Sequence, residues 1–132
     1  MTAVLQHVLC IDDDSDILEI AQMALEDVGQ LRVTCMNNGE LAVEQAAGLK
    51  PDFILIDVMM PGADGPTVLK ALRCQPGLSA VPVAFMTARI QEQEVRDYLD
   101  LGADGVISKP FDPMALPSEI RTIWETFHAG RH

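Results

Sequence analysis

The sequence is poor in basic and in aromatic residues. Lys and Arg number 9 against 20 Asp and Glu in 132 residues, so the formal net charge is −11. Negative charge in this excess repels nucleic acids and anionic membrane surfaces, so we expect neither direct DNA binding nor membrane docking. Aromatic residues make up 5% of the chain and apolar residues of all kinds 48%, which predicts an aliphatic core. A chain of this length forms one domain rather than two.

Long apolar runs and paired cysteine motifs are also missing. No stretch approaches the roughly 18 apolar residues of a membrane span, and no basic segment followed by an apolar run marks a signal peptide. Cys10, Cys35 and Cys74 show no CxxC spacing and lie in apolar or helical segments, so we expect buried free thiols in a reducing compartment. These features favour a cytoplasmic protein. We expect residues 1–128 to form the domain and residues 129–132 a loose tail.

Short apolar runs alternate with helical patterns along the chain, which is typical of repeated βα units with a parallel sheet. Three runs are continuously apolar, as strands buried on both faces must be: residues 8–11, 53–56 and 83–86. Residues 31–36 alternate polar with apolar side chains, which predicts an edge strand, and residues 106–107 supply a short fifth strand. Five segments carry apolar residues at helical spacing: 17–28, 39–47, 66–73, 90–101 and 120–127. The pattern predicts a single doubly wound α/β domain.

Polar residues follow four of the five predicted strands. They are Asp12, Asp13 and Asp14 after the first, Asp57 after the third, Thr87 after the fourth and Lys109 after the fifth. Doubly wound sheets bind ligands at the carboxyl ends of their parallel strands. We therefore expect these side chains to meet over one edge of the sheet, although nothing in the local sequence brings them together.

This set of side chains suits phosphate chemistry with a bound cation. Carboxylates a few ångströms apart repel one another unless a cation lies among them. Oxygen ligands without His or Cys favour Mg²⁺, with Mn²⁺ possible, over Zn²⁺, and Mg²⁺ leaves positions for water and phosphate oxygens. A carboxylate can attack phosphorus to form an acyl phosphate, while Lys109 and Thr87 donate to the phosphoryl oxygens. The cluster therefore predicts Mg²⁺-dependent phosphorylation of an aspartate.

Each of these residues also has a simpler interpretation. The three acids after the first strand could cap the following helix, because its dipole favours negative charge there. Asp57 could be a solvated turn residue, Thr87 a helix cap and Lys109 an ordinary exposed lysine. Only their joint placement favours a functional site. The side chain of Met59 fits a packing role better than coordination, since sulfur binds hard cations poorly.

Several motifs point to a known family. They occupy residues 8–14, 56–62, 64–65, 86–88, 102–104 and 109–111. Through them the chain resembles, over nearly its whole length, the receiver domains of response regulators in two-component systems. The resemblance implies a five-stranded parallel sheet of flavodoxin-like order 2-1-3-4-5 with helices on both faces.

The resemblance also assigns roles to the polar residues. Asp57 would be the phosphoacceptor, Asp13 and the backbone carbonyl of Met59 direct metal ligands, and Asp12 a ligand acting mainly through metal-bound water. Thr87 and Lys109 would bind phosphate oxygens, and the bond before Pro110 would be cis.

The same resemblance implies partners rather than outside substrates. The phosphoryl donor would be the phosphohistidine of a sensor histidine kinase or of a histidine phosphotransfer domain. The domain would assist its own phosphorylation and dephosphorylation without being an enzyme in the ordinary sense. It would switch contacts with a downstream protein, either as a monomer or as a phosphorylation-dependent dimer.

One position departs from the family pattern. Val106 stands where the family usually has an aromatic residue, so the ring rotation that accompanies movement of the threonine cannot occur here. We expect the output surface to comprise the fourth helix, the fifth strand and the fifth helix. No output domain follows the last predicted helix, so we expect the chain to act through protein contacts or to have been cut from a larger protein.

Two other functional classes remain open. A hydrolase working through an aspartyl phosphate is opposed by Met59, which stands where such enzymes carry the second acid of a DxD motif. A pseudo-receiver that only binds partners is favoured by Val106 and opposed by the complete set of acids and lysine.

Overall fold

The computed structural model describes residues 4–88 and 91–130. In these residues a five-stranded sheet has the order β2-β1-β3-β4-β5, and every neighbouring pair is parallel. The strands are β1 His7–Ile11, β2 Arg32–Met36, β3 Phe53–Asp57, β4 Val83–Thr87 and β5 Gly105–Ser108. The predicted α/β class and the flavodoxin-like strand order are confirmed.

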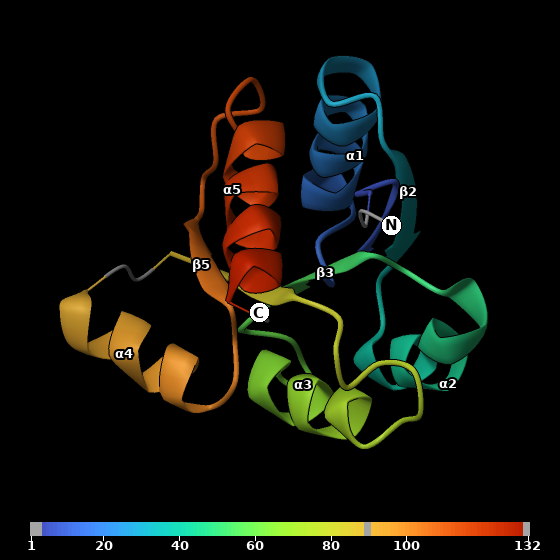
Figure 1. Ribbon diagram of the computed structural model, residues 1–132, viewed down its shortest axis with the longest axis vertical. Helices are drawn as coiled ribbons and strands as arrows, with labels where there is room; N and C mark the ends of the chain where they lie inside the picture. The colour runs from blue at the N-terminus through green and yellow to red at the C-terminus, as the bar shows by residue number, and fades with distance from the viewer. Residues whose placement is uncertain (1–3, 89–90, 131–132) are drawn as a thin grey trace.

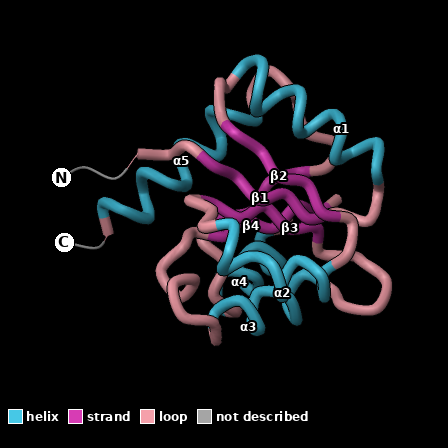
Figure 2. Tube along the Cα trace, turned by 90° about the vertical axis from the view of Figure 1, so that its right-hand side faces the viewer, coloured by secondary structure: helices cyan, strands magenta, loops and turns pink. Residues whose placement is uncertain are grey.

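Helices cover both faces of the sheet. They are α1 Ser15–Met23, α2 Gly39–Leu49, α3 Gly65–Arg73, α4 Glu92–Asp100 and α5 Leu116–Ala129, with a π-helical segment η1, Ala24–Val28, continuing α1. Helices α1 and α5 lie on one side of the sheet and α2, α3 and α4 on the other (Figures 1 and 2). The prediction for the fourth helix began at Ile90, which lies outside the described residues. The described helices are too short or too polar to cross a bilayer.

The central strands send alternate side chains into two separate cores. In β1, Val8 and Cys10 join the core under α1 and α5, whereas Leu9 and Ile11 join the core under α2 and α3. Every residue of β1, β3 and β4 is buried, as continuously apolar runs require. Strands β2 and β5 form the edges and are partly exposed. The edge position predicted for β2 is confirmed.

The cysteine prediction is only partly right. Cys10 is buried and Cys35 is partly buried, but Cys74 is exposed. Cys74 is the C-cap residue of α3, one position beyond the amphipathic stretch, so its side chain is not drawn into the core. The expectation of three buried thiols is therefore wrong for Cys74.

Gly65 brings the start of α3 against the end of β3. A Cβ at this position would lie 2.8 Å from the carbonyl oxygen of Asp57 and 3.0 Å from the Cα of Val58, backbone atoms that cannot turn aside. We expect Gly65→Ala to lower the free energy of unfolding by about 1–3 kcal/mol, measured by urea denaturation. Gly48→Ala is the matched control, because a Cβ at Gly48 meets open space within α2. The control should gain about 0.5–1 kcal/mol, and wild-type stability of Gly65→Ala would contradict this close approach.

Candidate functional site

Polar side chains from four strand ends meet in one pocket of about 290 Å³, which we call the acidic pocket. Its lining residues are Asp12, Asp13, Asp14, Asp57, Met59, Thr87, Ala88 and Lys109. The Lys109 ammonium nitrogen lies 3.0 Å from Asp12 Oδ2 and 3.2 Å from Asp57 Oδ1. The predicted convergence is thus present, because the six polar residues expected at the strand ends all line this pocket, together with Met59.

The hydrogen-bond ladder of the sheet extends to the residues that carry these side chains. The amide of Asp12 donates to the carbonyl of Met36 at 3.1 Å, and the amide of Lys109 donates to the carbonyl of Thr87 at 2.9 Å. Asp57 and Thr87 are themselves the last residues of β3 and β4. The Lys109–Pro110 peptide bond is cis, as expected. Rigid strand ends, rather than long loops, therefore fix the positions of the functional groups.

Burial sets the electrostatics of the pocket. Asp12 is fully buried and Asp57 is 5% exposed. Burial raises the pKa of Asp57, the negative charge of Asp12 raises it further, and the nearby Lys109 ammonium opposes both effects. Burial would lower the pKa of Lys109, but its hydrogen bond and attraction to Asp12, with those to Asp57, outweigh that effect and raise it. Lys109 therefore stays positively charged beside two carboxylates.

The acids of the pocket fit a hard divalent cation. Asp12, Asp13 and Asp57 each offer a carboxylate oxygen, and these three atoms lie within 4.8 Å of one another. Asp13 is exposed, so a cation here would keep contact with solvent, as Mg²⁺ usually does. Burial is the main cause of the raised pKa of Asp57, and the negative charges of Asp12 and Asp13 add to it. A divalent cation among the three acids would offset these charges.

The acids after β1 divide between two roles. Asp14 is the N-cap of α1, where its side chain accepts hydrogen bonds from the amides of Asp16 and Ile17. Asp12 faces Lys109 through Oδ2 and also accepts from the amide of Asp14 through Oδ1, at 2.9 Å. The capping interpretation therefore holds for Asp14 and not for Asp12.

A second cavity, of about 300 Å³, borders the acidic pocket on the side of α4. It is lined by Met59, Thr87, Ala88, Glu94 and Tyr98. The ring of Tyr98 packs edge-on against Phe85, with ring centroids 5.3 Å apart. Sequence reasoning missed Glu94 and Tyr98 because no strand end marks them. Their spacing of four residues, which places both on one face of a helix, was the available signal.

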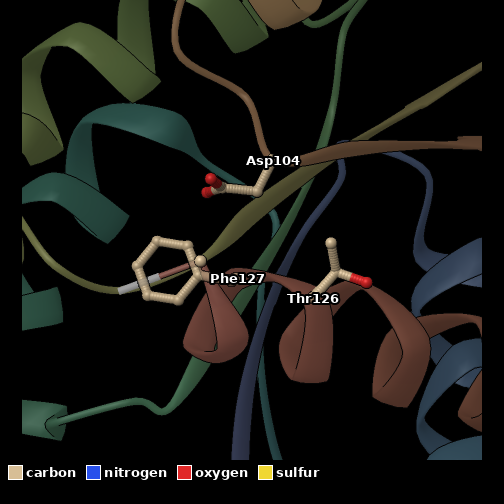
Figure 3. A pocket seen from close by; sticks show the side chains of 4 residues that line it. Asp104, Thr126 and Phe127 are labelled. Carbon is tan, nitrogen blue, oxygen red and sulfur yellow. The ribbon is translucent and has the colours of Figure 1, made fainter. Parts of the chain in front are cut away.

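A further hollow, of about 610 Å³, lies between the start of β5 and the end of α5 and is lined by Asp104, Thr126, Phe127 and Gly130. Figure 3 shows Asp104 on the chain entering β5, with Thr126 and Phe127 on α5. The Asp104 carboxylate accepts from Arg73 at 3.0 Å and from the amide of Val83 at 2.9 Å. Because this carboxylate ties α3 and β4 to the loop before β5, we assign it a structural role.

Comparison with known proteins agrees with the fold and shows the family. The model of the response regulator receiver domain family matches residues 8–121. The chain belongs to the response regulator receiver domain family, a class of phosphoacceptor modules in two-component signalling. Among solved structures, the chemotaxis protein CheY4 of Vibrio cholerae superposes with a TM-score of 0.84 at 28% identity, covering 91% of this chain and 99% of that one. A putative response regulator from Chloroflexus aurantiacus gives a TM-score of 0.83 at 29% identity, covering 92% and 99%.

Curated relatives extend beyond the region that this chain matches. The transcriptional regulatory protein CseB of Streptomyces coelicolor is 40% identical over 125 residues, which is 94% of this chain and 52% of that protein. The DNA-binding response regulator MtrA of Mycobacterium bovis is 33% identical over 121 residues, 92% of this chain and 51% of that protein. The chain thus spans about half the length of these relatives.

Proposed function

We propose that Asp57 accepts a phosphoryl group from the phosphohistidine of a sensor histidine kinase or of a histidine phosphotransfer domain, and that this switches contacts with a downstream protein. The observation that carries the proposal is the Lys109 ammonium, which lies within 3.2 Å of both Asp12 and Asp57 in a pocket that Thr87 also lines. Membership of the receiver family supports the same assignment. The net charge of −11 leaves direct DNA binding by these residues unfavourable.

The residues of the acidic pocket would perform the transfer by positioning and by charge. A carboxylate oxygen of Asp57 forms the new bond to phosphorus, and the bond between phosphorus and the donor imidazole nitrogen breaks. The electron pair of that bond returns to the imidazole ring. Lys109 and the Thr87 hydroxyl donate hydrogen bonds to the equatorial oxygens, where negative charge spreads in the transition state. No separate base is needed, because the attacking carboxylate has no proton to lose when it is ionised.

Asp12, Asp13, Asp57 and the backbone carbonyl of Met59 would hold Mg²⁺ or Mn²⁺. When bound, the cation offsets the negative charge that the acids and the incoming phosphate bring together. A ligand that binds only the folded protein stabilises it, by about 2.7 kcal/mol at a concentration one hundred times its Kd. We therefore expect the melting temperature to rise as Mg²⁺ is added and to return to its starting value with EDTA.

Thermal unfolding of two variants checks this expectation. Asp13→Asn removes one ligand from the pocket and should lose most of the Mg²⁺-dependent rise. Asp100→Asn, an exposed acid on α4, controls for the change in net charge and should keep it. An equal rise in both variants would place the cation elsewhere.

Transfer between proteins tests the proposed function as a whole. The chain is mixed with a phosphorylated histidine phosphotransfer domain in Mg²⁺ or in EDTA, and its intact mass is followed. We expect the mass of one phosphoryl group to appear in Mg²⁺ and not in EDTA. Failure to gain mass from this donor and from phosphoramidate alike would refute the proposal, and steady release of phosphate from unrelated phosphoesters would indicate a hydrolase.

A further inference from the structure

Two thiols stand side by side on neighbouring strands. Cys10 of β1 and Cys35 of β2 are register partners in a parallel pair. Neighbouring strands lie about 4.8 Å apart, which is within the roughly 4.4–6.8 Å between Cα atoms that a disulfide requires. Both residues pack into the core under α1 and α5, so their side chains leave the same face of the sheet.

The two thiols differ in access to solvent. Cys10 is fully buried, whereas Cys35 is partly exposed and borders a surface hollow of about 400 Å³ that Leu18 and Gln22 also line. The Cys35 sulfur lies 3.7 Å from the carbonyl oxygen of Leu18 and 4.0 Å from Oε1 of Gln22. The neighbouring Cys10 thiol lowers the pKa of Cys35, although burial and the charge of Glu26 act in the opposite direction. An accessible thiol with a second thiol behind it is the arrangement of a peroxide-sensitive pair.

We propose that Cys10 and Cys35 form an oxidation site at which a peroxide produces an intramolecular disulfide. The Cys35 thiolate attacks one oxygen of hydrogen peroxide, the O–O bond breaks, and the departing hydroxide takes up a proton, which leaves a sulfenic acid on Cys35. The Cys10 sulfur then attacks the Cys35 sulfur, the S–O bond breaks, and the thiol proton leaves with the hydroxide as water. In total two thiols and one hydrogen peroxide give one disulfide and two waters.

This site is separate from the acidic pocket, which neither thiol lines. Cys74 cannot form a disulfide with Cys10 or Cys35 of the same molecule, because α3 covers the opposite face of the sheet. The proposal therefore does not depend on the proposed phosphorylation of Asp57. It depends on the register of β1 with β2 and on the opening beside Cys35.

The experiment uses the Cys74→Ser protein at low concentration, so that the exposed thiol contributes nothing. After hydrogen peroxide treatment we expect both remaining thiols to be lost and the intact mass to fall by two hydrogens. Trypsin cleaves after Arg32 and so separates the two cysteines, which should remain in one linked species until a reductant is added. In Cys10→Ser/Cys74→Ser, oxidation should stop at a sulfenic acid on Cys35 that dimedone captures. In Cys35→Ser/Cys74→Ser, Cys10 should stay unmodified in the folded protein.

Two results would overturn the proposal. One is retention of both thiols in Cys74→Ser at peroxide concentrations that oxidise free cysteine in the same solution. The other is a disulfide that joins two molecules, seen as a dimer on a non-reducing gel.

Discussion

Asp57→Asn is expected to reduce Mg²⁺-dependent phosphorylation by phosphoramidate by more than about a hundredfold. The substitution keeps the size of the side chain but removes the carboxylate that would attack phosphorus. It also removes the negative charge beside Lys109, whose ammonium lies 3.2 Å from Asp57 Oδ1. The phosphorylated fraction, measured by intact mass at fixed times, gives the ratio of rates directly.

Loss of folding would not explain that result. Burial and the charge of Asp12 raise the pKa of Asp57, so the ionised carboxylate is less favourable in the folded protein than in the unfolded chain. When folding raises the pKa of an acid, the free energy of unfolding falls as the pH rises above the pKa that the acid has in the unfolded chain. A neutral amide at the same position avoids this loss. Without divalent cations, Asp57→Asn should therefore be at least as stable as wild type at pH 7. Asp100→Asn is the control for labelling, and wild-type labelling of Asp57→Asn would exclude Asp57 as the phosphoacceptor.

Lys109→Met is expected to slow phosphorylation by about a hundredfold to a thousandfold, the usual effect of removing one donor from a transition state that gathers negative charge. The methionine keeps an unbranched side chain but cannot donate to the phosphoryl oxygens. It also leaves Asp12 and Asp57 without the ammonium that lies between them, so stability in metal-free buffer should fall. Single-turnover labelling with phosphoramidate measures the rate.

A control variant separates the position of the Lys109 ammonium from its contribution to the net charge. Lys70→Met removes one positive charge from an exposed position on α3 and should label like wild type. Added Mg²⁺ should restore the stability of Lys109→Met more than its rate, because a cation can compensate the acids without replacing the missing donor. Labelling of Lys109→Met at the wild-type rate would remove Lys109 from the mechanism.

The sheet could be predicted from the sequence because its physical signals are local. Continuous apolar runs marked the three buried strands, and the polar alternation around Thr34 marked an edge. The conformation at the end of the first helix could not be predicted. Its apolar spacing predicted one helix up to Gly29, whereas the last part, Ala24–Val28, is π-helical. One widened turn changes the spacing of the buried side chains too little for sequence periodicity to show it.

The candidate site was predictable where a side chain follows a strand end, as Asp57 and Lys109 do. The sequence could not distinguish neighbouring residues of the same type that have different hydrogen-bond partners. Asp12 and Asp14 look alike in the sequence, yet one faces Lys109 and the other caps α1. The pairing of Cys10 with Cys35 was equally hidden, because it depends on the register between two strands.

The contacts of Val106 could not be predicted from the sequence either. Val106 pairs with Phe85 in the sheet, and Phe85 receives the ring of Tyr98 from α4. The aromatic ring beside Val106 in the sheet is therefore that of Phe85 from β4, and Phe85 in turn contacts Tyr98 of α4. Periodicity alone does not reveal these contacts, because they join residues from three separate elements.

The most direct test is to identify the residue that carries the phosphoryl group. The protein is phosphorylated with phosphoramidate, reduced with borohydride to convert an aspartyl phosphate into homoserine, digested and sequenced by mass spectrometry. We predict homoserine at position 57 alone, formed in Mg²⁺ and absent in EDTA. Modification at another acid, or equal modification of Asp57 without a divalent cation, would contradict a phosphoacceptor assembled from these strand ends around a metal.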